Sequence, residues 1–119
     1  TVGYELARLL GCRFIFAERQ DGNMTFRRGF MLQPGEKVLA VEDVVTTGGS
    51  VQEVVDLARD CGAEVLGVAA IVDRSQGKAN FGVPFSALVH MEITVYDPKS
   101  CPLCAKGLPL QSPGSRKAK

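Results

Sequence analysis

The segment that decides the fold is VLAVEDVVTTGGS, residues 38–50. Its first four residues, VLAV, are apolar on both faces of a strand, which is typical of a buried strand in a parallel sheet. Glu42 and Asp43 follow, and residues 44–50 form a loop with two threonines and two glycines. Ser50 and Glu53 stand three residues apart and predict a capping box at the start of a helix. The segment therefore predicts a strand, an acidic pair, a turn and a helix.

The predicted turn has the chemistry of a phosphate-binding site. A helix N-terminus presents free N–H groups and a partial positive charge. Gly48 and Gly49 let backbone amides approach an anion closely, and Thr46, Thr47 and Ser50 add hydroxyl donors. We therefore predict a cradle for a phosphate monoester.

The two acids that precede the turn add a second feature. Glu42 and Asp43 cannot bind a phosphate, but they suit the hydroxyls of an attached sugar, or a magnesium ion bound to that phosphate. The alternative is an ordinary strand-to-helix turn, which explains Ser50 and the glycines but not two acids beside two threonines. Neither the P-loop pattern nor the dinucleotide-binding glycine pattern is present.

The flanking segments extend the same alternation of strands and helices. Apolar periodicity predicts helices over residues 1–11 and 51–61, the second stopped by Gly62. It predicts strands over residues 13–17, 24–30, 37–41, 65–72 and 85–96, with Asp21-Gly22 as a hairpin turn between the first two. This order predicts an α/β fold, a mostly parallel sheet flanked by helices. Right-handed crossovers then bring Glu42-Asp43 and Asp73-Arg74 to one edge of the sheet, where such folds bind ligands.

Composition excludes several classes of function. The 119 residues include 14 basic and 13 acidic side chains, and 45% are hydrophobic. This balance excludes disorder of the whole chain, and it leaves no cationic excess for general nucleic-acid binding. No apolar run reaches the roughly 18 residues of a membrane span, and the first residues do not resemble a secretory signal. We expect no membrane partner and no nucleic-acid partner.

The four cysteines fall into two groups. Cys12 and Cys61 end apolar helical patterns, and we expect them to be small buried hydrophobes. Cys101 and Cys104 have C-x-x-C spacing, which leaves three possibilities open: reduced thiols near the tail, half of a zinc site shared between subunits, or a redox pair. His90 lies in a strand pattern and is a poor third ligand, and we assign it no catalytic role. Reduced cysteines favour a cytoplasmic location.

The segment from Val38 to Ser50 closely resembles the phosphoribosyl pyrophosphate (PRPP) motif of the type I phosphoribosyltransferases: an apolar strand, two acids, two small apolar residues, and then threonines, glycines and a serine. With RFIFAERQDGNMTFRRGF, the VDR at residues 72–74 and the tail YDPKSCPLCAKGLPL, the chain is similar to the orotate phosphoribosyltransferases of bacteria. The resemblance runs from Thr1 to about Arg116. Members of that family begin earlier, with a further strand and a glycine-containing loop, so the chain resembles an N-terminally incomplete, Rossmann-like core.

The resemblance implies a reaction and a role for each matching residue. Ribose 5-phosphate is transferred from PRPP to N1 of orotate, giving orotidine 5′-monophosphate and pyrophosphate, with Mg²⁺ as cofactor. Asp43 is implied to steady charge near the anomeric carbon as well as to contact ribose, and Thr46 and Arg74 are implied to bind orotate. The implied PRPP-binding residues are Glu42, Asp43, Val44, Val45, Thr46, Thr47, Gly48, Gly49 and Ser50. No residue is assigned as a resident metal ligand, and the alternative for Arg74 is a surface ion pair with Asp73.

The loop over residues 18–28 matches the mobile catalytic loop of that family. Arg19 and Arg27 are the candidate catalytic cations, and Arg28 is a third. Because Arg27 and Arg28 are adjacent on a predicted strand, they are expected to point to opposite faces, so that only one can face the site. The alternative is that these arginines are solvated strand charges.

The remaining expectations concern the oligomeric state, the domain bounds and the alternative functions. The family implies a homodimer that binds the small molecules PRPP and orotate. The phosphoribosyltransferase core is expected over residues 1–111, with a flexible tail over residues 112–119. Two alternative functions share the same motif: a purine-base phosphoribosyltransferase, and a PRPP-binding regulator without catalysis.

Overall fold

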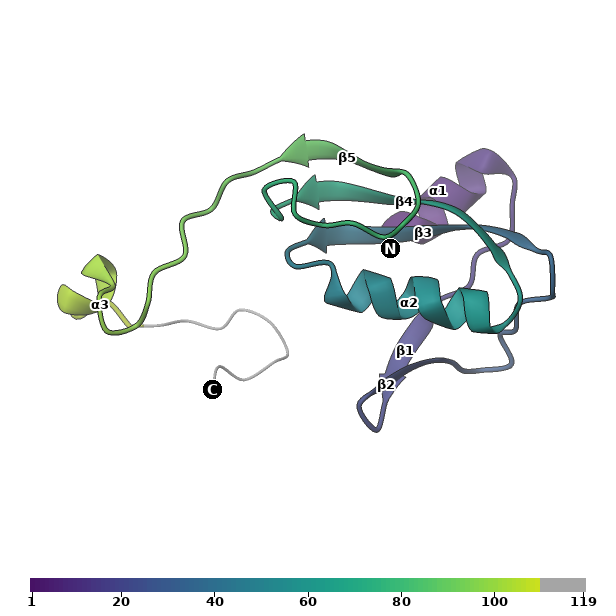
Figure 1. Cartoon of the computed structure of the whole chain (residues 1–119), viewed down its shortest axis with the longest axis horizontal. Helices are drawn as coiled ribbons and strands as arrows, with labels where there is room; N and C mark the ends of the chain where they lie inside the picture. Colours follow the sequence, from purple (N-terminus) through teal and green to yellow (C-terminus); the bar gives the residue numbers. More distant parts are fainter. Residues whose placement is uncertain (110–119) are drawn as a thin grey trace.

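A parallel sheet of three strands carries the predicted site. The computed structural model describes residues 1–109, and there β3 (Lys37–Val45), β4 (Glu64–Asp73) and β5 (Phe85–His90) pair in the order β3-β4-β5. Helix α2 (Gly49–Asp60) connects β3 to β4, as Figure 1 shows. Parallel neighbours need such a crossover, because a tight turn can join only antiparallel strands. The α/β prediction with a mostly parallel sheet is confirmed.

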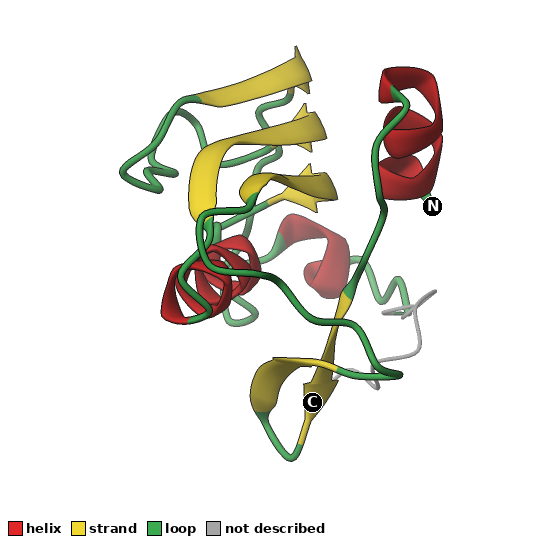
Figure 2. Ribbon diagram, turned by 90° about the vertical axis from the view of Figure 1, so that its right-hand side faces the viewer, coloured by secondary structure: helices red, strands yellow, loops and turns green. Residues whose placement is uncertain are grey.

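Two helices lie on opposite sides of this sheet. Helix α1 (Val2–Leu10) lies behind the strands in Figure 1 and α2 in front of them, and the turned view of Figure 2 separates them. Gly11 ends α1 at a φ of 65°, a left-handed conformation that glycine adopts without a steric penalty. The predicted first helix is confirmed.

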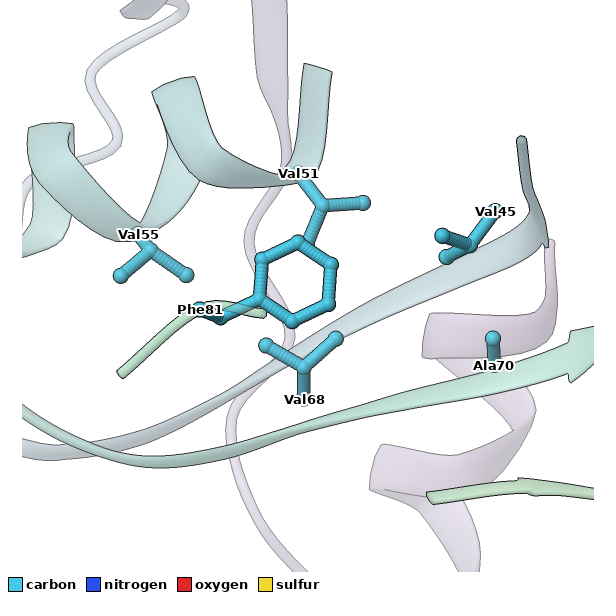
Figure 3. Packing of buried hydrophobic residues seen from close by; sticks show 6 residues of the cluster. All are labelled: Val45, Val51, Val55, Val68, Ala70 and Phe81. Atoms are coloured by element: carbon cyan, nitrogen blue, oxygen red, sulfur yellow. The ribbon is translucent and has the colours of Figure 1, made fainter. Parts of the chain in front are cut away.

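The main core lies between α2 and the sheet. Val51 and Val55 of α2 are four residues apart, so they lie on one face of the helix, toward Val45 and Val68 of the strands. The ring of Phe81, from the segment between β4 and β5, lies between Val51 and Val68 (Figure 3). This packing fixes the start of α2 against the end of β3, which is where the predicted phosphate turn lies.

A two-stranded hairpin stands apart from the main sheet. Strands β1 (Ala17–Gln20) and β2 (Asn23–Phe26) pair antiparallel across the turn Asp21-Gly22, whose φ angles of 49° and 87° confirm the predicted turn. The strands predicted over residues 13–17 and 24–30 were wrong in their bounds. Residues 13–16 have no neighbouring strand among the described residues, and an apolar cavity of about 250 Å³ separates part of that segment from β3. Without a partner, an apolar run does not become a strand.

The end of the hairpin also corrects the placement of two arginines. Arg28 has a φ of 59° and Gly29 a φ of 77°, and the Phe30 N–H donates to the Arg27 carbonyl at 3.0 Å. This is a turn, so the prediction that Arg27 and Arg28 alternate along a strand was wrong.

Three other expectations needed correction, and one short helix was not predicted. β3 continues through Glu42 and Asp43 because Val44 and Val45 still pair with β4. β5 ends at His90 instead of residue 96, because its partner β4 ends at Asp73. Cys12 is exposed and Cys61 is only half-buried, so neither is the buried hydrophobe that was expected. The short helix α3 (Pro102–Ala105) was not predicted, and the tail predicted over residues 112–119 lies outside the described residues.

Candidate functional site

One hollow of about 410 Å³ lies where β3 gives way to α2. It is lined by Glu42, Asp43, Val44, Val45, Thr46, Thr47, Gly48, Gly49, Ser50 and Val51, and we call it the 42–51 hollow. The residues predicted to bind PRPP therefore surround a single concave site at the carboxyl end of a parallel strand. Ligands of open α/β sheets bind outside this end of the strands.

The turn in this hollow depends on Gly48. Gly48 is the N-cap residue of α2 with a φ of 85°, and a Cβ placed on it would lie 3.0 Å from Cε1 of Phe81. Only glycine combines this backbone conformation with so close an approach. The buried Phe81 ring thus supports the floor of the turn.

We expect the substitution Gly48→Ala to lower the free energy of unfolding by about 2 kcal/mol or more, since it adds the strain of a positive φ to overpacking against Phe81. Gly77→Ala is the matched control, because Gly77 also has a positive φ of 74° but a Cβ there meets nothing within 4 Å. Urea unfolding measures both variants. Equal losses in the two variants would show that the contact with Phe81 contributes nothing.

The first turn of α2 presents backbone amides to the hollow. Thr47 Oγ1 accepts the Gly49 N–H at 3.5 Å, and the Gln52 N–H donates to the Gly48 carbonyl at 2.8 Å. The predicted capping box was wrong, because α2 has no side-chain cap bond and Glu53 instead pairs with Arg19 at 2.9 Å. The amides of Ser50 and Val51 belong to the first turn, where helical N–H groups have no intrahelical acceptor, so an anion can accept from them.

The acidic pair lies on β3 at one wall of the 42–51 hollow. Glu42 Oε1 accepts the Asp43 N–H at 2.9 Å, and Asp43 Oδ1 accepts the Val44 N–H at 2.7 Å. Burial raises the pKa of Glu42, and the neighbouring Asp43 side chain raises it further. Two carboxylates can accept bonds from sugar hydroxyls. They also fit Mg²⁺, which proteins commonly bind through one or two carboxylates while substrate phosphates complete its coordination.

The next strand ends beside this site with Asp73 and Arg74. The register pairs Val45 of β3 with Asp73 of β4, and Asp73 with His90 of β5. The Arg74 N–H donates to the Val45 carbonyl at 2.7 Å, which ties the predicted orotate-binding residue to the end of the strand that leads into the phosphate turn. The prediction that both charged pairs end their strands at one edge is therefore only partly confirmed: Asp73 ends β4 there, but Glu42 pairs with Ala70, so the acidic pair lies before the end of β3.

The Asp73 carboxylate interacts with Ser75 and His90, not with Arg74. The buried carboxylate accepts the Ser75 N–H at 2.8 Å and contacts His90 Nδ1 at 3.1 Å. Arg74 Nε is itself buried and has no hydrogen-bond partner among residues 1–109. The alternative of an Asp73–Arg74 surface pair is therefore not observed, and Arg74 is not among the residues that line the 42–51 hollow. The pairing of His90 was missed, although the register of adjacent parallel strands was the signal that could have found it.

The Asp73 contacts predict a pH-dependent stability. Hydrogen bonds from Ser75, first from its side chain and then from its backbone, hold the pKa of Asp73 below its ordinary value, and His90 adds to this effect. Since the folded-state pKa lies below the unfolded one, the stabilisation is complete above about pH 4 and is lost as the pH falls through the folded-state pKa.

Asp73→Asn is therefore expected to lower the free energy of unfolding by about 1 to 3 kcal/mol at pH 7, with the difference from the unsubstituted protein shrinking on acidification. Denaturant unfolding at a series of pH values measures this. Asp60→Asn, at an exposed carboxylate, is the control. A deficit for Asp73→Asn that stays constant down to the acid limit would contradict the assignment.

The arginines of the hairpin lie outside the residues that line the hollow. Arg19 donates to Glu53 of α2 at 2.9 Å and to the Gly22 carbonyl. Arg28 pairs with Glu18 at 3.0 Å, and Arg27 lies 3.9 Å from the same carboxylate. The structure thus shows each arginine paired with an acid, and the predicted catalytic roles of Arg19 and Arg27 stay predictions.

Comparison with known proteins agrees with this geometry. The family model described as "Phosphoribosyl transferase domain" matches residues 2–81. The chain is 58% identical over 116 residues to the orotate phosphoribosyltransferase of Caldanaerobacter subterraneus, and 56% identical over 115 residues to that of Thermotoga maritima. These matches cover 98% and 97% of this chain but 61% and 62% of the relatives, so the chain spans about three fifths of their length.

Solved structures share the fold. An adenine phosphoribosyltransferase from Rhodothermus marinus superposes with a TM-score of 0.60 at 23% identity, over 76% of this chain and 62% of that one. An orotate phosphoribosyltransferase from Aeropyrum pernix gives a TM-score of 0.57 at 26% identity, over 74% of this chain and 52% of that one. Among the described residues, no helix has the length and apolarity to cross a bilayer. By its family match, its fold and the arrangement of the 42–51 hollow, the chain belongs to the phosphoribosyl transferase domain family.

Proposed function

We propose that the chain is the PRPP- and orotate-binding part of an orotate phosphoribosyltransferase of pyrimidine biosynthesis. The observation that carries the proposal is the 42–51 hollow, in which an acidic pair and a glycine-containing helix start face one space. The identity of 55% to 58% with several orotate phosphoribosyltransferases selects orotate over purine bases. The likeness to an adenine phosphoribosyltransferase, at 23% identity, supports the fold alone.

In the proposed mechanism, two parts of the 42–51 hollow bind two parts of PRPP. The amides and hydroxyls from Thr46 to Ser50 hold the 5-phosphate, while Glu42 and Asp43 accept the ribose hydroxyls. The bond between C1 and pyrophosphate breaks as positive charge develops on the sugar, and N1 of orotate forms the new bond to C1. Asp43, which lines the same hollow as the phosphate turn, is proposed to stabilise that charge electrostatically. No nucleophilic side chain is required.

Orotate is proposed to lie beside the end of β4. Arg74 offers a planar guanidinium that suits the orotate carboxylate or its adjacent carbonyl, with Thr46 as a second contact. Holding the base against the anomeric carbon lowers the barrier by fixing the reacting atoms in line.

Three further properties belong to the proposal. Glu42 or Asp43 would hold Mg²⁺ together with the substrate phosphates, and the ion would supply charge neutralisation for the leaving pyrophosphate. Arg19 or Arg27 would reach the pyrophosphate only by exchanging its present carboxylate partner. We also propose a homodimer in the cytoplasm, since the family resemblance implies a dimer and the exposed thiols suit a reducing compartment.

The test is the conversion of orotate and PRPP, with Mg²⁺, into orotidine 5′-monophosphate and pyrophosphate, followed by chromatography. Adenine, hypoxanthine and xanthine are offered in parallel. Turnover of orotate alone supports the proposal, and turnover of a purine base instead would replace it. Calorimetric binding of PRPP without turnover of any base would favour the non-catalytic regulator.

A further inference from the structure

The C-x-x-C pair is a feature that the proposed transferase reaction does not use. Cys101 is the N-cap residue of α3, and its Sγ accepts the Cys104 N–H at 3.5 Å. Residues three apart lie on one side of a helical turn, and an interaction between the Cys101 and Cys104 side chains contributes to the pKa shifts of both thiols. Cys101 is half-buried, whereas Cys104 is exposed. The chain thus presents two thiols with access to solvent.

The position of α3 leaves the Cys101 and Cys104 thiols accessible to small reagents in solution. Figure 1 shows α3 set apart from the sheet, at the end of the strand-free segment that follows β5. Lys99 and Lys106 flank the pair and are exposed. The other two cysteines lie elsewhere in the chain, Cys12 just after α1 and Cys61 at the end of α2. A reaction at the dithiol therefore involves Cys101 and Cys104 alone.

The pKa values of the two thiols shift in opposite directions. Hydrogen bonds from Cys104, first from its backbone N–H, lower the pKa of Cys101. The contact with Cys101 raises the pKa of Cys104. A thiolate is the attacking form in disulfide exchange, so Cys101 is suited to react first and Cys104 to complete the reaction.

Residues 1–109 of one copy do not supply a complete metal site around the pair. Structural zinc takes four ligands, and residues 1–109 contain no group of three or more His, Cys, Asp or Glu side chains that could hold a metal ion. A disulfide needs only these two cysteines.

We propose that Cys101 and Cys104 form a reversible redox site that exchanges with disulfides of the oxidised-glutathione class. The Cys101 thiolate attacks one sulfur of the oxidant, whose S–S bond breaks and releases one thiolate, which takes a proton from water. Cys104 loses its proton to water, and its thiolate attacks Cys101 Sγ and displaces the second thiol. The net change oxidises the dithiol to the Cys101–Cys104 disulfide and reduces one small disulfide to two thiols.

The experiment incubates the reduced protein with oxidised glutathione, alkylates the remaining thiols and maps them by mass spectrometry. The expected result is a Cys101–Cys104 peptide that is lighter by two hydrogens, whereas the exposed Cys12 can form only a glutathione adduct. Cys104→Ser is expected to stop at a glutathione adduct on Cys101, and Cys101→Ser to form no disulfide. The control variant, Cys12→Ser with Cys61→Ser, is expected to oxidise as the unsubstituted protein does.

Two outcomes would overturn the proposal. One is retention of all four thiols at oxidant ratios that oxidise a free C-x-x-C peptide. The other is protection of the pair by bound zinc that a chelator releases, which would make it half of a metal site between copies.

Discussion

Replacing Arg74 by glutamine is expected to raise the KM for orotate by about 100-fold and to leave the KM for PRPP within about twofold. Arg74 Nε is buried and has no hydrogen-bond partner among the described residues, so no protein acceptor there competes with a ligand for the guanidinium. Removing a charged donor to a ligand carboxylate removes about 3 kcal/mol of binding. Steady-state kinetics with each substrate varied in turn measures both constants.

The control is Lys78→Gln, which removes a cation from the exposed part of the segment that follows Arg74. It is expected to change neither constant. A structural role for Arg74 would appear as a lower unfolding midpoint with an unchanged KM for orotate, and this result would remove Arg74 from the base-binding site.

Amide substitutions of the acidic pair are expected to weaken PRPP binding by about 10-fold to 100-fold each. Glu42→Gln and Asp43→Asn preserve the size of each side chain and the acceptor oxygen of each local backbone bond, but remove the charge that ribose hydroxyls or Mg²⁺ would contact. Calorimetric titration with PRPP in the presence of Mg²⁺ measures the loss.

The free energy of unfolding of Glu42→Gln shows whether Glu42 acts in PRPP binding or in folding. Burial raises the pKa of Glu42 above its unfolded value, so ionisation of this group opposes folding once the pH exceeds about 4.3. At neutral pH the variant is therefore expected to be as stable as the unsubstituted protein or more stable, opposite in sign to Asp73→Asn. Loss of PRPP binding together with loss of stability would mean that Glu42 is a folding residue, and PRPP binding unaffected by either amide would contradict the assignment of the pair.

Local sequence explained the parts of the fold that depend on neighbouring residues. The strand from Lys37, the helix that Gly62 ends and the Asp21-Gly22 turn follow from apolar periodicity and from residues that tolerate a positive φ. The 42–51 hollow was predictable for the same reason, because its wall is one continuous stretch of chain.

Features that depend on distant partners were harder to predict. The apolar residues 14–16, which follow Arg13, did not form a strand, because no neighbouring strand pairs with them within the described part of the chain. Glu53 matched a capping box, but Arg19 of the hairpin competes for its carboxylate. The contact between Asp73 and His90 joins residues 17 positions apart, and only the register of β4 with β5 brings them together.

The binding of ribose 5-phosphate tests the central claim most directly. In an ¹⁵N-labelled sample of the protein, titration with ribose 5-phosphate is expected to shift the backbone amides of Thr47, Gly48, Gly49, Ser50 and Val51 most strongly. Ribose without the phosphate is expected to shift them far less, because the helix N-terminus recognises the anion. If these amides stay unshifted at saturation, or if the largest shifts fall outside the 42–51 hollow, then this turn is not the phosphate-binding site.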